Sequence, residues 1–223
     1  MKKIIDLSLE IYDKSPVFPG DPETVIRQCH SIGKTGYNVS CLSISSHAGT
    51  HIDAPKHFFN NGTSVDKIQL SKCIGHASVF DFTWKKEKET ITVRDFMKFD
   101  DKIKEGARLI IKTGWYKVYP DKRYFFDMPS VNPEACGFLA ERKIACLAVD
   151  MPGVNYENFA EAHKILLSKD ILIVESLNNL DEITENEVFF VAVPLRLNGV
   201  DGSPCRAFAI EGLSGDETTA YNF

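Results

Sequence analysis

The sequence predicts a single compact α/β domain, residues 1–223, with a mixed sheet and a β-rich N-terminal half. Two observations predict this fold class. Short apolar runs with strand character fill the first half, and helix-like and strand-like segments alternate in the second. A chain of 223 residues can bury a sizeable core in one domain, and no internal repeat, low-complexity segment or linker divides the sequence.

The first half is expected to consist mainly of strands. Alternation puts Ile5, Leu7 and Leu9 on one face of the first strand. A glycine-containing turn at 32–36 joins the next two strands into a hairpin-like pair, and Thr92 is expected to cap a short helix. The expected strands cover residues 4–11, 24–30, 37–45, 75–82 and 107–112.

The second half predicts strand–helix–strand units. Asn132 is a favourable N-cap and Pro133 suits the first helical position, so a helix should run from here to about residue 142. Asp150 and Glu175 follow short apolar runs typical of buried strands. This succession predicts some parallel sheet with helices on its faces. The other expected elements are a helix at 157–168 and strands at 144–149, 171–174, 187–195 and 206–210.

Composition excludes several classes of partner. The formal net charge is −5 and no basic patch stands out, so a nucleic acid partner is not expected. No stretch approaches the roughly 20 consecutive apolar residues that a membrane-spanning helix needs. The expected partner is therefore a small-molecule substrate, with neither nucleic acid nor membrane involved.

The six cysteines are expected to be free thiols. None forms a C-x-x-C pair, and although disulfides stay open, nothing in the spacing suggests one. Cys41 and Cys146 lie in apolar, strand-like stretches, which favours buried thiols in a reducing compartment. The basic N-terminus has no apolar segment after it, so the sequence predicts a cytoplasmic protein.

The candidate site is concentrated in residues 46–58, Ser-His-Ala-Gly-Thr-His-Ile-Asp-Ala-Pro-Lys-His-Phe. Three of the six histidines, His47, His51 and His57, lie here together with Asp53. The glycine and proline residues between them favour a loop or strand end over a helix. Two imidazoles and one carboxylate commonly bind a catalytic divalent metal. The segment therefore predicts a site in which His47, His51 and Asp53 are ligands and His57 stands beside them; a polar loop with surface histidines is the alternative.

A second pair of candidate ligands lies downstream. His163 falls inside an expected helix, and Glu175 ends the next expected strand. A carboxylate there needs a partner, because burying an unpaired charge is costly, and a metal ion would provide one. Taken alone, His163 is typical of a hydrogen-bonded helix histidine and Glu175 of an ion-pair member.

Two aromatic features have open interpretations. Phe18 lies in a rigid loop at 16–22 that contains three prolines, where it either covers a substrate pocket or plugs the surface. Residues 115–129 are aromatic-rich and irregular, and are compatible with a lid, a dimer contact or a packed loop.

The segment from His47 to Phe58 closely resembles the H-x-G-T-H-x-D-x-P-x-H-F signature of the cyclase family, which includes bacterial kynurenine formamidases and isatin hydrolases. Asp-Leu-Ser at 6–8 resembles the family's opening strand, and Pro-Val-Phe-Pro-Gly-Asp at 16–21 resembles its P-V-W/F-P-G-D loop. Ala162-His163 and Glu175-Ser176 match its later histidine and glutamate. The resemblance implies a swivelling β/β/α-type fold and a homodimer or homotetramer.

The resemblance also implies roles for the site residues. His47, His51 and Asp53 would bind a first divalent ion, Zn²⁺ or Mn²⁺, and Asp53 could bridge to a second ion held by His163 and Glu175, so that one or two ions are expected per subunit. His57 would be the acid/base residue, and Phe18 would contact the substrate where formamidases tend to have tryptophan. Gly153 and Asn155 replace the serine and second acid of a D-x-x-S-x-D pattern in the formamidases. These departures bear on the substrate and not on the metal ligands.

The expected function is metal-dependent hydrolysis of an amide or lactam C–N bond in a small, aromatic substrate, with an N-formylkynurenine-like arylformamide as the leading candidate. His57 would take the proton of the attacking water and pass it to the leaving nitrogen. The alternatives are a metal-dependent lyase or cyclase acting on a small carbonyl compound, and a non-catalytic metal- or ligand-binding protein. Structural zinc sites favour thiolates, and no cysteine lies in the cluster, which argues against the last alternative.

Overall fold

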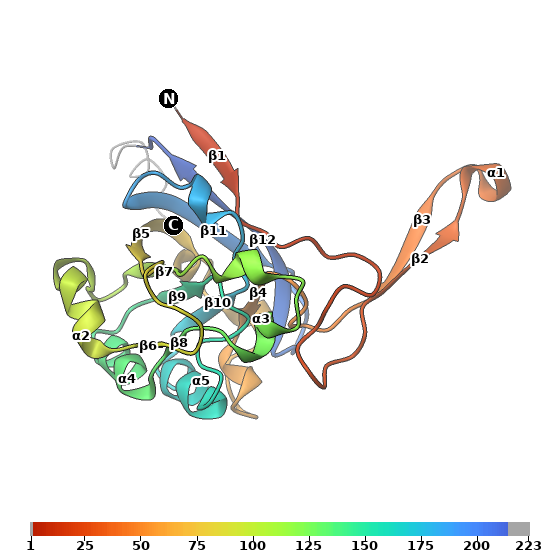
Figure 1. The fold of residues 1–223 in the computed structure, drawn as a ribbon. Helices are drawn as coiled ribbons and strands as arrows, with labels where there is room; N and C mark the ends of the chain where they lie inside the picture. The colour runs from red at the N-terminus through yellow and green to blue at the C-terminus, as the bar shows by residue number, and fades with distance from the viewer. Residues whose placement is uncertain (1, 214–223) are drawn as a thin grey trace.

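The computed structural model describes residues 2–213 and has a mixed sheet of eight strands at its centre (Figure 1). The strand order is β1-β12-β11-β5-β7-β9-β10-β4, and β4 also pairs with β12, so seven strands form a closed circuit with β1 outside it. Strands β5, β7, β9 and β10 are parallel, as the sequence predicts, and the other pairings are antiparallel. The bounds are β1 Lys3–Asp6, β4 His51–Asp53, β5 Ile74–Asp81, β7 Arg108–Lys112, β9 Cys146–Val149, β10 Leu172–Glu175, β11 Glu187–Pro194 and β12 Gly202–Glu211.

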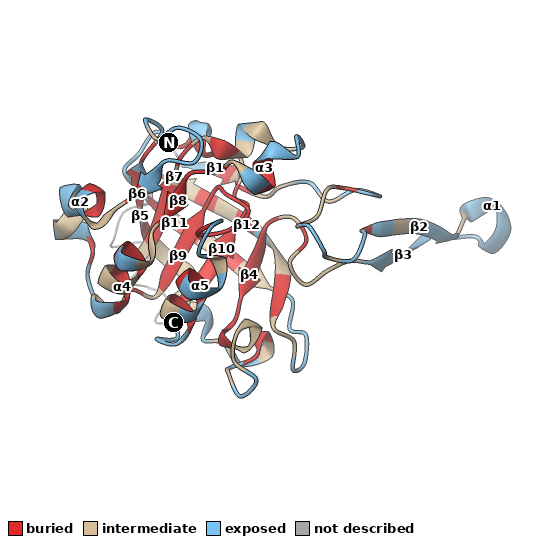
Figure 2. Ribbon diagram, turned by 60° about the horizontal axis from the view of Figure 1, so that its bottom comes forward, coloured by how far each residue is buried: buried red, intermediate tan, exposed pale blue. Residues whose placement is uncertain are grey.

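Two helices cover one face of the parallel strands (Figure 2). Leu139 and Leu166, one from each helix, belong to the same buried cluster as Leu109 and Leu147 of the sheet, whereas Ile110 belongs to a second cluster. Successive strand residues point to opposite faces and both faces are buried, so the middle of β7, all of β9 and most of β10 are continuous apolar runs. The helices are α4 Pro133–Glu141, which the Asn132 side chain caps by accepting from the N–H of Ala135 at 2.8 Å, and α5 Phe159–Leu167.

The remaining elements are short. Two small sheets pair β2 Val25–His30 with β3 Val39–Ser43 and β6 Thr90–Ile91 with β8 Ser130–Val131. The short helices are α1 Ile32–Thr35, α2 Val93–Phe96, α3 Arg123–Phe126 and the 3-10 turns η1 Pro55–His57, η2 Val65–Lys67, η3 Leu70–Lys72, η4 Met97–Lys102, η5 Trp115–Val118 and η6 Leu180–Glu182. None of the helices within residues 2–213 is long and apolar enough to cross a membrane. The mixed α/β architecture is confirmed, and the swivelling β/β/α description stays a prediction.

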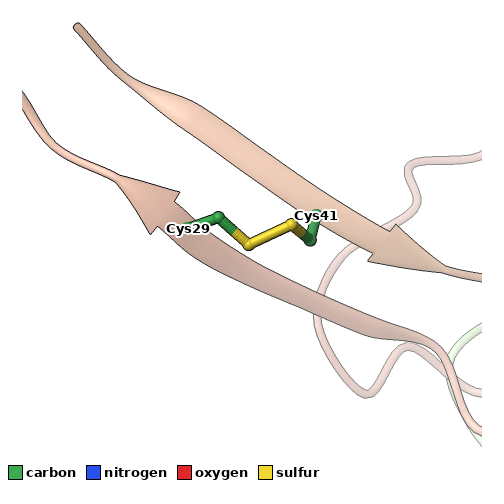
Figure 3. The surroundings of a disulfide bond; sticks show 2 residues. All are labelled: Cys29 and Cys41. Atoms are coloured by element: carbon green, nitrogen blue, oxygen red, sulfur yellow. A yellow bond between two sulfur atoms is a disulfide. The ribbon is translucent and has the colours of Figure 1, made fainter. Parts of the chain in front are cut away.

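Strands β2 and β3 form a hairpin arm that projects from the body of the molecule (Figures 1 and 2). A disulfide joins Cys29 and Cys41 across it (Figure 3), so the expectation of six free thiols is wrong for this pair. A register shift between Gln28 and His30 places Cys29 beside Cys41, with the two Cα atoms 6.0 Å apart. The spacing of the two cysteines along the chain does not indicate this register, so the sequence does not predict the bond. The other four cysteines are free, and three of them are buried.

Two strand boundaries differ from expectation. The first strand is regular only to Asp6, because Leu9 donates its N–H to the Thr50 hydroxyl at 2.7 Å instead of continuing the ladder. The last strand begins at Gly202 rather than at residue 206, because Gly202–Pro204 pair with β4. The second difference brings a further acidic residue, Asp201, to the candidate site.

Candidate metal centre

Strand β4 and the turns on either side of it hold the histidine cluster. Gly49, with φ +60°, turns the chain between His47 and His51 in a conformation that suits glycine. Gly202 lies against the cluster, since a Cβ there would be 2.9 Å from Cε1 of His47. The backbone thus places His47 before β4, His51 and Asp53 on it, and His57 in η1 directly after it.

The three ligands expected from this segment do meet. Nδ1 of His47 lies 2.8 Å from Oδ1 of Asp53, and Nε2 of His51 lies 3.4 Å from the same oxygen. Asp53 and His51 are almost fully buried, and His47 is only slightly exposed. The three side chains therefore form a compact cluster around the Asp53 carboxylate.

His163 and Glu175 join this cluster from the second half of the chain. Antiparallel pairing of β10 with β4 sets Glu175 opposite His51, and α5 brings His163 to the same point. Nε2 of His163 lies 3.0 Å from Oε1 of Glu175 and 3.4 Å from Oδ2 of Asp53. The two sets of residues expected from sequence are one site in the fold.

In their neutral tautomers, His51 and His163 would each present an Nε2 lone pair to a ligand. Nδ1 of His51 donates to the carbonyl of Gly49 at 2.8 Å, and Nδ1 of His163 donates to the carbonyl of Phe159 at 2.7 Å. Each Nε2 therefore faces the carboxylates. Nε2 of His51 and Oδ2 of Asp53 are buried and have no hydrogen-bond partner among the described residues. Orphaned buried nitrogen and oxygen atoms that converge in this way fit a divalent cation.

Asp53 is common to two possible ligand groups. His47, Asp53 and His57 offer donor atoms within 4.8 Å of one another, and so do His51, Asp53 and Glu175. Oδ1 of Asp53 lies near His47 and His51, and Oδ2 lies near His163, so this carboxylate contacts ligand candidates from both halves of the chain. His57 lies close enough to His47 and Asp53 to share an ion with them, although the sequence predicts that it stands beside the ligands.

The buried charges perturb one another strongly. Burial disfavours the ionised forms of Asp53 and Glu175, but the surrounding histidines outweigh it and hold the pKa of each carboxyl below its usual range. For His57 burial dominates and lowers the pKa, so the neutral imidazole is favoured.

Asp201 is a site residue that the sequence reading missed. Its Oδ2 lies 2.7 Å from Nε2 of His47 and 3.3 Å from Nδ1 of His57, and Ser46 donates its hydroxyl to Oδ1 at 3.3 Å. It directly precedes β12, and placing the start of that strand at residue 206 left it in an unassigned loop. The feature that could have indicated Asp201 is its position directly before Gly202, whose backbone approaches His47 too closely for a larger residue.

A cavity of about 370 Å³ opens beside the cluster. His51, Asp53 and His57 line one side of it, and Phe18 lines another, with its ring stacked 5.5 Å from Phe159. The pocket can hold a flat apolar molecule against the histidines. Its aromatic wall comprises Phe18, Tyr119, Tyr124, Phe125 and Phe159. The aromatic segment 115–129 packs against the core and contributes to this wall, and its role as a lid or a dimer contact stays a prediction.

Comparisons with known proteins agree with this arrangement. Residues 5–156 match the family described as "Putative cyclase". A kynurenine formamidase of Bacillus thuringiensis subsp. konkukian (strain 97-27) is 32% identical over 209 residues, covering 91% of this chain and 95% of the relative. A solved structure titled a potential metal-dependent hydrolase with cyclase activity superimposes with a TM-score of 0.82 at 28% identity, covering 96% of this chain and 100% of the other. The structure of isatin hydrolase A from Labrenzia aggregata, bound to benzyl benzoate, gives a TM-score of 0.83 at 25% identity and covers 94% of this chain and 93% of the other.

Proposed function

This chain belongs to the cyclase family, and from that premise we propose that it is a metal-dependent hydrolase that cleaves the amide C–N bond of a small aromatic substrate. One observation carries the proposal: five metal-ligand side chains from both halves of the chain converge beside an aromatic-walled pocket. An arylformamide like N-formylkynurenine is the leading substrate, since kynurenine formamidases are among the relatives, and a lactam like isatin is the next.

The proposed ligand roles are those that the family resemblance implies. His47, His51 and Asp53 would hold one divalent ion, and His163 and Glu175 would hold a second, with Asp53 in contact with both sets. Such ions would supply the charge that acidifies a water molecule and polarises the amide carbonyl. The nitrogen and oxygen donor set suits both Zn²⁺ and Mn²⁺.

His57 is the acid/base residue in this proposal. Asp201 accepts from its Nδ1 at 3.3 Å, which leaves Nε2 free for proton transfer, and His57 lines the pocket. Burial keeps the imidazole neutral, so it takes a proton from the attacking water and returns it to the leaving nitrogen. Phe18 and Phe159 pack on the aromatic ring of the substrate.

A paired measurement tests the function. Elemental analysis of purified protein gives the metal and its stoichiometry, and a substrate screen with added zinc or manganese covers N-formyl aryl amines, isatin-like lactams and simple esters. We expect bound metal and hydrolysis of at least one aryl amide or lactam, with oxygen from heavy-oxygen water in the acid product. Metal-loaded protein that is inert on the whole panel, or turnover without solvent oxygen in an acid, contradicts hydrolysis.

The proposed assembly is a homodimer or homotetramer that uses the hairpin arm. An isolated two-stranded hairpin is marginal in water, and this one exposes Leu42 by 63% and Ile32 by 66%. A second copy of the chain would cover these side chains. Light scattering after size exclusion should show that Leu42→Asp yields monomer, whereas Met97→Asp, at a residue of η4 that is 50% exposed, does not. A wild-type monomer contradicts the assembly.

The cytoplasmic location stays a prediction. Disulfides persist mainly in oxidising compartments, so the redox state of Cys29 and Cys41 in cells bears on it directly. Thiol trapping in freshly lysed and fractionated cells measures the redox state of this cysteine pair and the compartment that contains the protein. We expect the pair to be reduced if the protein is cytoplasmic.

A further inference from the structure

The loop at residues 16–22 forms one side of the cavity. Residues 16–21 all line the cavity, and the ring of Phe18 is partly buried in its aromatic wall. The Pro-Gly pair at 19–20 occupies the middle of a tight turn, in which the N–H of Asp21 donates to the carbonyl of Phe18 at 3.0 Å. Because this turn joins the two residues, a contact that holds Asp21 also holds Phe18 in the wall.

One hydrogen bond connects this loop to the candidate metal centre. The hydroxyl of Ser45 donates to Oδ2 of Asp21 at 3.0 Å and accepts from the N–H of His47 at 3.1 Å. Among the described residues, the bond between Ser45 and Asp21 is the only hydrogen bond that joins residues 16–22 to another segment. The Ser45 oxygen is therefore shared between the loop that carries Phe18 and the backbone of a proposed metal ligand.

The hairpin arm explains why Asp21 and Ser45 meet. Val25 pairs with Ser43 at the base of the arm, so the chain enters β2 and leaves β3 side by side. Asp21 precedes β2 and Ser45 follows β3, and their hydrogen bond closes the arm at its base. Within residues 2–213 Asp21 forms no ion pair, so the contact with Ser45 is what its carboxylate contributes to the fold.

The other contacts of Phe18 do not fix its distance from the metal centre. Its ring centroid lies 5.5 Å from that of Phe159 and 6.2 Å from that of Phe125. Such apolar contacts are non-directional, whereas a hydrogen bond to a carboxylate has a defined length and angle and is stronger than one to a neutral acceptor. The bond through Ser45 therefore determines how far the loop stands from His47, and with it the width of the space for a flat ligand.

We propose that Asp21 is a positioning residue, which holds the Phe18 side of the cavity at a fixed distance from the metal centre through the hydroxyl of Ser45. The inference rests on the proposed hydrolysis, in which Phe18 packs on the substrate, and adds a residue to which that function gives no role. Without this tether Phe18 withdraws from the wall, and a flat aromatic ligand binds less tightly. Metal binding persists, because the side chain of His47 keeps its contact with Asp53.

Three variants test the tether with formanilide as the substrate. Asp21→Ala removes the acceptor, Asp21→Asn keeps an acceptor oxygen, and Glu23→Ala removes an exposed carboxylate of the same segment that does not line the cavity. We expect KM to rise about tenfold in Asp21→Ala, with kcat within about threefold of the wild type, because the wall holds substrate and transition state alike. Asp21→Asn should return KM to within about threefold of the wild type, and Glu23→Ala should leave it unchanged. Equal losses in Asp21→Asn and Asp21→Ala overturn the proposal, because the charge and not the tether would then matter.

A double-mutant cycle with Phe18→Ala shows whether Asp21 acts through the ring. Phe18→Ala alone should raise the KM of formanilide at least as much as Asp21→Ala does. In that background the tether has no ring to hold, so the addition of Asp21→Ala should change KM by less than about twofold. Additive losses overturn the proposal, because Asp21 would then act on the substrate directly or on the fold as a whole.

Binding of indole provides a readout that needs neither turnover nor metal. In isothermal titration of the metal-free proteins with this flat aromatic ligand, Kd should be about tenfold weaker for Asp21→Ala than for the wild type and Glu23→Ala, and close to the wild-type value for Asp21→Asn. If none of the proteins hydrolyses formanilide but indole shows this order, the proposed function fails and the positioning role stands. Equal affinity of the wild type and Asp21→Ala for indole, or no binding to the wild type, overturns the positioning role.

Discussion

Nε2 of His163 lies 3.4 Å from Oδ2 of Asp53, which joins a helix of the second half of the chain to the histidine strand of the first. Neither residue can be solvated there, because His163 is fully buried and Asp53 is 1% exposed. Their contact, and that of His163 with Glu175, makes the candidate metal centre a single two-part site. Removal of a candidate ligand from either half of the chain should therefore weaken metal binding by the whole site.

His163→Ala should therefore lower both metal content and activity. The variant removes one nitrogen donor and leaves the Glu175 carboxylate buried without its closest partner. We expect loss of about one ion per subunit if two bind, and a fall in kcat/KM of roughly a hundredfold or more. Elemental analysis and kinetics on the same preparation measure both. His76→Ala, at a histidine that does not line the cavity, is the control, and full metal content in His163→Ala would remove His163 from the ligand set.

His57→Ala separates a proton-transfer role from a ligand role. If His57 is the acid/base residue, metal content stays at the wild-type level and kcat falls about 10²–10⁴-fold. The distinction needs measurement because His57, His47 and Asp53 also offer donor atoms close enough to share an ion. Metal content that falls in step with activity would assign His57 as a ligand.

Asp201→Asn should disturb His57 without emptying the site. The carboxylate accepts from Nδ1 of His57 at 3.3 Å and contacts His47 at 2.7 Å, so it fixes the orientation of both rings. An amide can present its NH₂ group to these nitrogens and leave His57 in the wrong tautomer. We expect kcat to fall roughly 10–100-fold at nearly unchanged KM, as for a partner that orients a site residue. A change confined to KM would place Asp201 in substrate binding instead.

The sequence predicts which candidate ligands come together better than it predicts the residues around them. His47, His51 and Asp53 were predictable because three donors on one short strand and its flanking turn leave few other interpretations. His163 and Glu175 were predictable as a pair only through the family resemblance, since nothing local indicates that β10 pairs with β4. Asp201 was missed because its place in the site depends on where β12 begins, which only strand pairing in the folded chain determines.

For the fold too, local features could be predicted and long-range pairings could not. The Asn132–Pro133 start of α4 and the alternation of helices and strands after it are local features of the sequence, and the structure confirms them. The bond between Cys29 and Cys41 depends on a register shift in the arm, and the closure of the sheet depends on β12 reaching β4. Register and closure are properties of strand pairing, so single-strand patterns do not contain them.

Metal affinity should fall steeply as the pH falls. Burial opposes protonation of His51 and His163, but Asp53 and Glu175 outweigh it and raise the pKa of each histidine to about 10. At pH 7 both imidazoles of the metal-free protein are therefore protonated, and an ion must displace those protons. The apparent Kd should weaken by about a factor of ten per pH unit for each displaced proton, from pH 8 down to pH 6.

Titration calorimetry in buffers of different ionisation enthalpy counts the released protons. More than one proton per ion at pH 7 is the expected result. An affinity that does not change between pH 6 and pH 8 would mean that the histidines are already neutral without metal. His57→Ala is a useful comparison, because burial lowers the pKa of His57 and it should contribute no proton.

Removal of metal should destabilise the whole domain, not only the site. The proposed ligands lie on β4, β10 and α5, with His47 just before β4, so an ion would link the histidine strand to the parallel sheet and its covering helix. Binding to the folded state alone stabilises it by about 2.7 kcal/mol when free metal is at 100 times Kd. For a chain of this size that amounts to a rise in melting temperature of roughly 5–11 °C. Differential scanning calorimetry before and after chelation, with metal added back, measures the shift. His57→Ala should retain most of it and His163→Ala should lose most of it, whereas equal shifts in both variants would show that the ion binds elsewhere.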